Sequence, residues 1–73
     1  MITVKCFARY RAMLEFAEME LPVVATVEEL LQDPRIARLP ADALLAVNQR
    51  FVDRTAALKD GDEVALMPPV SGG

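Results

Sequence analysis

The sequence has 73 residues, of which 53% are hydrophobic, and a formal net charge of −3. A chain of this length forms one small domain with a thin core, because it buries only about 60% of its unfolded surface. The eight basic residues are scattered along the chain, which argues against a protein that binds nucleic acid through a basic patch or docks on an anionic membrane surface.

The chain contains one cysteine, Cys6, and no histidine. An internal disulfide and a metal site built from several Cys or His ligands are therefore excluded. A free thiol fits a reducing compartment, so a cytoplasmic location is expected. The first residues lack the basic segment and apolar run of a signal peptide, and no apolar stretch approaches the roughly 18 residues that span a membrane.

The first third of the sequence predicts two strands with a short helix between them. Residues 2–8 alternate between an apolar face and a mixed face, which is typical of a strand. Over 10–17 the apolar side chains recur at i, i+3, i+4 and i+7, which predicts one or two helical turns. Residues 18–21 alternate strictly and predict a second strand, which ends at Pro22.

The middle of the sequence predicts the main helix. Thr26 and Glu29 have the spacing of a capping box, in which the Thr26 hydroxyl accepts from the Glu29 amide and the Glu29 carboxylate reaches back. A helix is expected over about 27–33. Pro34 fits poorly beyond the first turn of a continuous helix, so a second short turn is expected over 34–38.

The last third predicts three more strands. The run 43–48 is rich in strand-forming residues and ends in a turn at Asn48-Gln49, after which 50–52 restarts a short strand. Gly61 supplies the positive φ that the next turn needs. Residues 63–67 form the last strand, which the following prolines stop.

This order of elements predicts an α+β domain of two layers. A right-handed crossover through the helix lays the later strands beside the first one, with the last strand parallel to it at the centre of a mixed sheet. One main helix then covers one face of that sheet. Residues 1–68 are assigned to the domain and residues 69–73 to a flexible C-terminal tail.

The side chains offer little for catalysis. Cys6 falls on the inner face of the first strand and has no histidine to activate it, so a buried structural thiol is favoured over a nucleophile. Ser71 is the only serine and likewise has no base. The grouped carboxylates lie where helix capping, turns or solvation explain them.

The end of the sequence has a different character. Two prolines are followed by Val70-Ser71-Gly72-Gly73, so the exit from the sheet is stiff and the last two residues have no side chains. The stretch from Pro69 to Gly73 reaches about 16 Å at ~3.3 Å per residue. Such an end could thread a narrow channel and present only its α-carboxylate. The alternative is a frayed terminus that contains glycines by chance.

Several segments, in the same order along nearly the whole chain, resemble the family of molybdopterin synthase small subunits, which are ubiquitin-like β-grasp sulfur carriers. The matching segments are Phe7-Ala8-Arg9 with Arg11, Thr26-Val27-Glu28, Leu45-Ala46-Val47-Asn48-Gln49, Leu58-Lys59-Asp60-Gly61-Asp62-Glu63-Val64-Ala65, and Pro68-Pro69-Val70-Ser71-Gly72-Gly73. Where this family often has a glycine after the first helical segment, this chain has Glu15-Phe16-Ala17-Glu18.

The resemblance implies that the reactive group of the chain is its C-terminal carboxylate, and that the folded domain presents this group to partner proteins. A partner adenylyltransferase (sulfurylase) would use ATP and magnesium to adenylate the Gly73 carboxylate, and a sulfur donor would convert it to a thiocarboxylate. The tail, with Gly72 keeping it thin, would enter the large synthase subunit in a heterotetramer. There the sulfur would convert a cyclic pyranopterin precursor to molybdopterin. The chain itself would bind no cofactor or metal, and only the assembled complex would be an enzyme.

Alternation along the strands also predicts a docking surface. Phe7 and Met67 fall on the face opposite the core positions, and Phe51 can join them. We expect these three side chains to form an exposed apolar patch away from the helix, which contacts the large subunit. In the alternative, Phe7 or Phe51 packs under a loop. The resemblance adds tail contacts with the partner through Pro68, Pro69, Val70 and Ser71.

Other functions remain compatible with this pattern. A sulfur carrier for thiamine biosynthesis or another thiolation pathway shares the fold and the terminal Gly-Gly. A ubiquitin-like modifier joined to lysines and an interaction domain with an inert tail are further alternatives. The segments 68–71 and 47–49 favour the synthase subunit.

Overall fold

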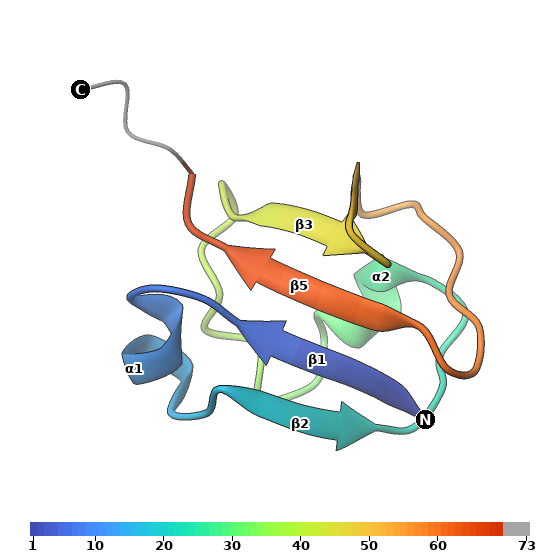
Figure 1. Cartoon of the computed structure of the whole chain (residues 1–73), viewed down its shortest axis with the longest axis horizontal. Coiled ribbons are helices and arrows are strands. Elements are labelled where there is room, and N and C mark those ends of the chain that lie inside the picture. The colour runs from blue at the N-terminus through green and yellow to red at the C-terminus, as the bar shows by residue number, and fades with distance from the viewer. Residues whose placement is uncertain (70–73) are drawn as a thin grey trace.

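The computed structural model describes residues 1–69, and Val70, Ser71, Gly72 and Gly73 lie outside the described residues. Its elements are β1 (Ile2–Cys6), α1 (Tyr10–Leu14), β2 (Glu18–Leu21), α2 (Val27–Leu30), β3 (Leu44–Val47), β4 (Arg50–Val52) and β5 (Glu63–Met67). The strands form one sheet in the order β2-β1-β5-β3-β4, as Figure 1 shows. The predicted α+β class and mixed sheet are confirmed.

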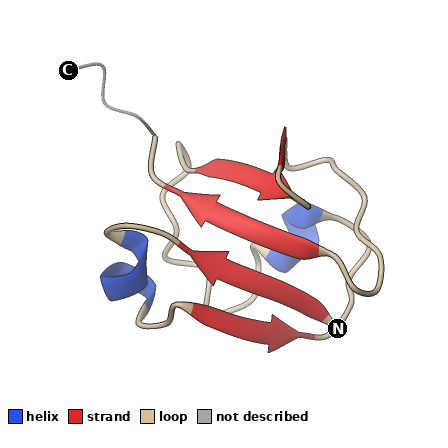
Figure 2. Ribbon diagram, in the orientation of Figure 1, coloured by secondary structure: helices blue, strands red, loops and turns tan. Residues whose placement is uncertain are grey.

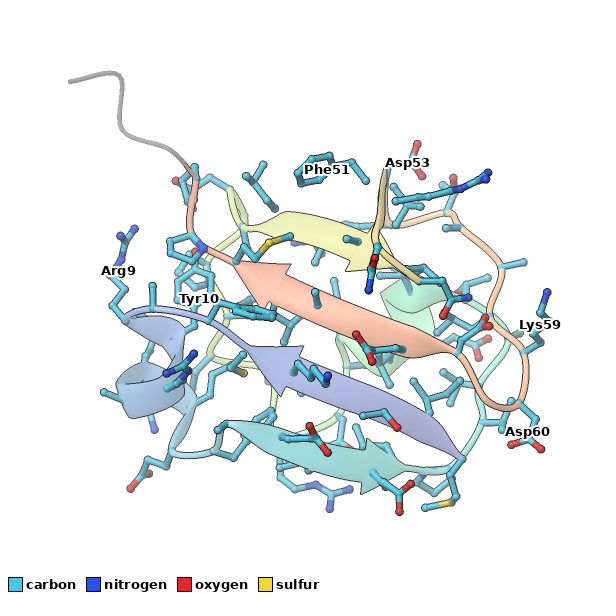
Figure 3. The ribbon with its side chains drawn as sticks, viewed as in Figure 1. Arg9, Tyr10, Phe51, Asp53, Lys59 and Asp60 are labelled. Carbon is cyan, nitrogen blue, oxygen red and sulfur yellow. The ribbon has the colours of Figure 1, made fainter. Side chains whose placement is uncertain are left out.

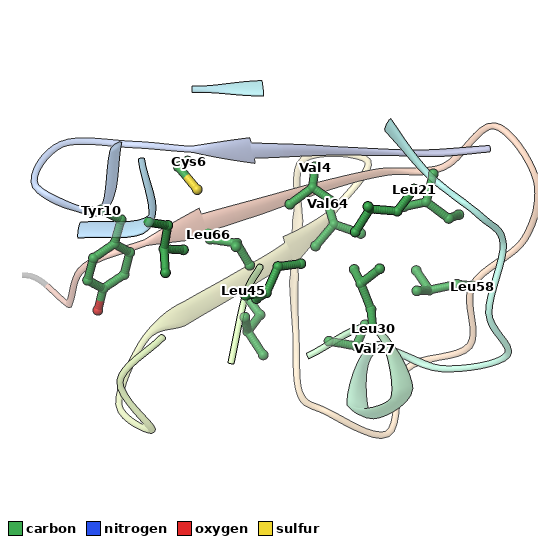
Figure 4. Close-up of a cluster of buried hydrophobic side chains, with 13 residues drawn as sticks. Val4, Cys6, Tyr10, Leu21, Val27, Leu30, Leu45, Leu58, Val64 and Leu66 are labelled. Atoms are coloured by element: carbon green, nitrogen blue, oxygen red, sulfur yellow. The ribbon is translucent and has the colours of Figure 1, made fainter. Parts of the chain in front are cut away.

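The centre of the sheet is the parallel pair of β1 and β5, as the sequence predicts. Val4 lies opposite Val64 and Cys6 lies opposite Leu66, so the apolar positions of both strands point to the same face. The helix α2 lies behind that face (Figure 2) and brings Val27 to it. The core is therefore one layer between sheet and helix, shown in Figure 4, and its buried members are Ile2, Val4, Cys6, Tyr10, Leu14, Leu21, Val27, Leu30, Ile36, Leu45, Leu58, Val64 and Leu66.

The first strand and the first helix are both shorter than predicted. The strand expected over 2–8 ends at Cys6, because Ala8 adopts a left-handed φ of 53° that turns the chain into α1. The helix expected over 10–17 ends at Leu14, because Glu15 adopts φ 65° and ψ 30°. Neither residue is a glycine, the residue type that usually indicates a left-handed turn, so the sequence did not predict where these elements end.

The main helix is also shorter than its predicted span of 27–33. The Thr26 Oγ1 accepts from the Glu29 amide at 3.3 Å, as the capping box predicts. The Glu29 carboxylate, however, accepts from the backbone N–H of Ala25 at 3.1 Å and not from that of Thr26. The second short turn expected over 34–38 is confirmed, and the Asp33 carboxylate accepts from the Arg35 N–H there at 2.9 Å.

The hairpin between β3 and β4 has a two-residue turn at the predicted place. Asn48 and Gln49 have φ values of 51° and 69°, which is the pattern of a type I′ turn. The Asn48 amide donates to the buried Asp62 carboxylate at 2.9 Å, and its oxygen accepts from the Glu63 N–H at 3.0 Å. The bond from Asn48 is the main cause that lowers the pKa of Asp62. The hairpin tip is thereby fixed to the start of β5.

Replacing Glu15 with glycine is expected to stabilise the domain by about 0.5–1 kcal/mol, because glycine adopts the left-handed conformation without the steric cost of a Cβ. The ion pair lost with Glu15 joins it to Arg38 at 3.7 Å between largely exposed side chains, and such pairs contribute little. Urea unfolding measures the change. The matched control is Glu28→Gly, which places glycine inside α2 and is expected to destabilise. If the Glu15→Gly variant were less stable than the parent, the left-handed conformation of Glu15 would not be a source of backbone strain.

Candidate docking site and tail exit

The face of the sheet opposite α2 has a groove at the place predicted for the apolar patch. The groove encloses about 360 Å³ and is lined by Lys5, Phe7, Ala46, Gln49, Phe51, Glu63, Ala65 and Met67. Phe51 is 73% exposed and projects from the short edge strand β4, as Figure 3 shows. Phe7 is 37% exposed. The structure thus brings Phe7, Phe51 and Met67 to one groove, while their role in docking stays a prediction.

The strand register explains why the groove is hollow. Ala46 on β3 lies opposite Phe51 on one side and opposite Ala65 on the other. Two alanines therefore form a low floor, and larger side chains stand around it. An apolar hollow with aromatic walls suits a protein partner that inserts a side chain at its centre.

Charged side chains lie along one border of this groove. Lys5 on β1 lies between two carboxylates, with its Nζ 3.3 Å from Glu63 and 3.9 Å from Glu18. These side chains are about a third to more than half exposed, so the pairs contribute little to stability. They give the apolar floor a polar rim, which is the usual composition of a protein interface.

A second, smaller groove adjoins the first one. It encloses about 230 Å³ and is lined by Lys5, Cys6, Phe7, Arg11, Ala17 and Glu18. Lys5 and Phe7 line both grooves, so the two are neighbours. Strand alternation did not indicate Lys5, Gln49 or Arg11 as site residues. For Arg11 the signal was its place in the family motif.

Cys6 is buried, as predicted for a structural thiol. Its side chain is 2% exposed and belongs to the core between β1 and β5. Burial raises the pKa of the Cys6 thiol, which disfavours the thiolate that would act as a nucleophile. The residue is therefore part of the core, as the structural interpretation predicts.

The described part of the tail leaves the sheet beside Phe7. The Phe7 N–H donates to the Leu66 carbonyl oxygen at 3.1 Å, one residue before β5 ends at Met67. Pro68 and Pro69 follow and are partly buried. The predicted contacts of Val70 and Ser71, and the predicted roles of Gly72 and Gly73, fall on residues outside the described part of the chain.

Within residues 1–69, no group of three Asp, Glu, Cys or His side chains is arranged to hold a metal ion. No helix in this part of the chain is long and apolar enough to cross a membrane.

Comparison with known proteins gives matches along the whole chain. The profile of the ThiS family matches residues 4–73. The molybdopterin synthase sulfur carrier subunit of Escherichia coli is 41% identical, with all of both chains covered. The subunit of that name from Chlamydomonas reinhardtii is 38% identical over 99% of this chain and 98% of its own length.

The solved structures agree with this assignment. A putative molybdopterin converting factor subunit 1 from Pyrococcus furiosus superposes with a TM-score of 0.76 at 34% identity, covering 94% of this chain and 97% of that one. The two chains therefore share the fold described above. With a family profile matched over residues 4–73 and relatives aligned over nearly their full length, the chain belongs to the ThiS family of β-grasp sulfur carriers.

Proposed function

We propose that this chain is the sulfur carrier subunit of a molybdopterin synthase. The observation that carries the proposal is the match, over nearly the whole of both chains, with curated relatives that bear this name. An apolar groove whose lining includes Met67, the last residue of β5, supports the proposal. The single main helix leaves that face of the sheet open to a partner.

Activation begins at the Gly73 carboxylate. A carboxylate oxygen attacks the α-phosphorus of ATP, pyrophosphate leaves, and an acyl adenylate forms. This activation comes first because an unactivated carboxylate oxygen is a poor leaving group. Hydrosulfide from a sulfur donor then adds to the acyl carbon, AMP leaves and a proton is lost, which gives the thiocarboxylate. An activating adenylyltransferase binds the ATP and magnesium, and this chain binds no cofactor.

The thiocarboxylate then reacts in the large synthase subunit. Residues 69–73 form the tail that enters this subunit, and residues 1–68 form the body that docks on it. Two carriers and two large subunits make a heterotetramer, in which the sulfur is transferred to a cyclic pyranopterin precursor. The catalytic pocket belongs to the large subunit, so the isolated chain has no activity of its own. A free buried thiol fits the reducing cytoplasm as the compartment.

Intact mass spectrometry tests the first half of this function. After incubation with the activating enzyme, ATP, magnesium and a sulfur donor, the chain is expected to gain the mass difference between sulfur and oxygen. Omitting ATP is the control and should leave the mass unchanged. No gain with an activating enzyme that loads another carrier would refute the proposal.

A second assay separates the pathways. Thiocarboxylated chain mixed with the large subunit and precursor is expected to yield molybdopterin. A carrier for thiamine biosynthesis or another thiolation pathway would gain sulfur and yield none, and a lysine modifier would form isopeptide adducts.

A further inference from the structure

The Arg11 side chain is held in place, but it has no acidic partner in the described part of the chain. Its Nε donates to the Cys6 carbonyl oxygen at 3.2 Å, which fixes the guanidinium against the end of β1. Within residues 1–69 it forms no ion pair, whereas Lys5 on the same border contacts both Glu18 and Glu63. The outer nitrogens of a fixed guanidinium are suited to a ligand of opposite charge.

Arg11 also lies at the place where a partner would receive the tail. It lines the smaller groove, which shares Lys5 and Phe7 with the larger apolar groove. The Phe7 N–H donates to the Leu66 carbonyl oxygen near the end of β5. Arg11 therefore lies next to the surface that a partner covers if it docks on the apolar groove.

The neighbouring Arg9 does not share this arrangement. Its Cζ lies 5.6 Å from the centroid of the Tyr10 ring, so the guanidinium is placed over an aromatic face. Figure 3 shows Arg9 and Tyr10 together at the end of the sheet where α1 begins. Arg9 lines neither groove, and Lys5, which lines both, is paired with Glu18 and Glu63. Among the described residues that line the two grooves, Arg11 is thus the cation without an ion pair.

We infer that Arg11 determines partner specificity by binding an Asp or Glu side chain of the large synthase subunit, beside the channel that takes up the tail. This inference rests on the proposed function. A guanidinium binds a carboxylate through two parallel hydrogen bonds, which fixes orientation as well as supplying energy. In a chain of net charge −3, a single fixed cation at one end of the groove favours one docking orientation and disfavours partners that are basic at that point.

Binding of the purified large subunit to the full chain tests this inference. Arg11→Glu is expected to weaken the complex about 10- to 100-fold in low salt, because it replaces attraction by repulsion within the interface. Lys59→Glu makes the same change of charge at the opposite end of the sheet (Figure 3) and is the matched control. It is expected to change affinity less than about threefold. Arg11→Lys keeps the charge without the planar fork and should fall between the two.

Salt dependence separates a contact with the partner from a structural role. An intermolecular ion pair predicts that the Arg11→Glu penalty shrinks as NaCl rises, because added salt screens charges in a partly solvated contact. An equal penalty at all salt concentrations, matched by an equal loss of thermal stability, would overturn the inference. So would equal affinities of Arg11→Glu and Lys59→Glu. Failure of the unmodified chain to gain sulfur or to bind the large subunit would instead refute the proposed function.

Discussion

Deleting Gly73 is expected to lower the conversion of the pyranopterin precursor by about 100-fold or more, with no change in thermal stability. The physical reason is reach: each extended residue spans about 3.3 Å, and a misplacement of about 1 Å can cost roughly 100-fold in rate. Chromatographic measurement of the product after a fixed reaction time gives the ratio. Intact mass shows whether the shortened chain still gains sulfur.

The variant Gly73→Ala separates length from thickness. It keeps the position of the carboxylate and adds one Cβ, so its activity is expected to lie between that of the parent chain and that of the deletion. Full activity of the deletion variant would overturn the role of the tail. Equal losses in both variants would show that the reaction tolerates neither a shorter tail nor an added Cβ, and a fully active Gly73→Ala would show that thickness at this position does not limit it.

Phe51→Asp is expected to weaken binding to the large subunit by about 100-fold or more, because it removes an aromatic side chain from the groove and places an unpaired carboxylate against an apolar partner. The fold should tolerate the change, since Phe51 is 73% exposed. Titration calorimetry with the purified large subunit measures the affinity, and circular dichroism checks the fold.

Val23→Asp is the matched control for this measurement. Val23 is also an exposed apolar side chain, at 45%, but it lies between β2 and α2 and does not line the docking groove. Its replacement is expected to change affinity less than about threefold. Equal effects at both positions, or an unchanged affinity of Phe51→Asp, would show that the groove is not the docking surface.

The sequence predicted the sheet better than the helices. Alternation of burial is a local property of strands, so the predicted strand 63–67 matches β5. Its parallel pairing with β1 was predicted separately, from the right-handed crossover through the helix. The ends of the helices depended on left-handed turns at Ala8 and Glu15, which are not glycines and gave no local signal. The expected helix 27–33 ends at Leu30, after which the Gln32 and Asp33 N–H groups donate to carbonyl oxygens three residues back, a tightening that the apolar spacing did not indicate.

The same distinction applies to the candidate site. Phe7 and Met67 could be placed on the outer face because alternation along a strand determines which way a side chain points. The low floor of Ala46 and Ala65 required the register between β3 and β5, which the sequence does not state. The position of the Arg11 side chain depends on the turn after β1 and on its hydrogen bond to the Cys6 carbonyl oxygen. The spacing of residues in the sequence could not predict either feature.

The central pairing of β1 with β5 also has a kinetic consequence. The two strands that form the middle of the sheet are residues 2–6 and 63–67, so nearly the whole chain separates them. Contacts of such long sequence separation slow folding, because the loop must close before pairing gains energy. During synthesis β1 must wait for the last strand, so the sheet is complete only once residues 63–67 have been made. A partly made chain therefore lacks the centre of its sheet.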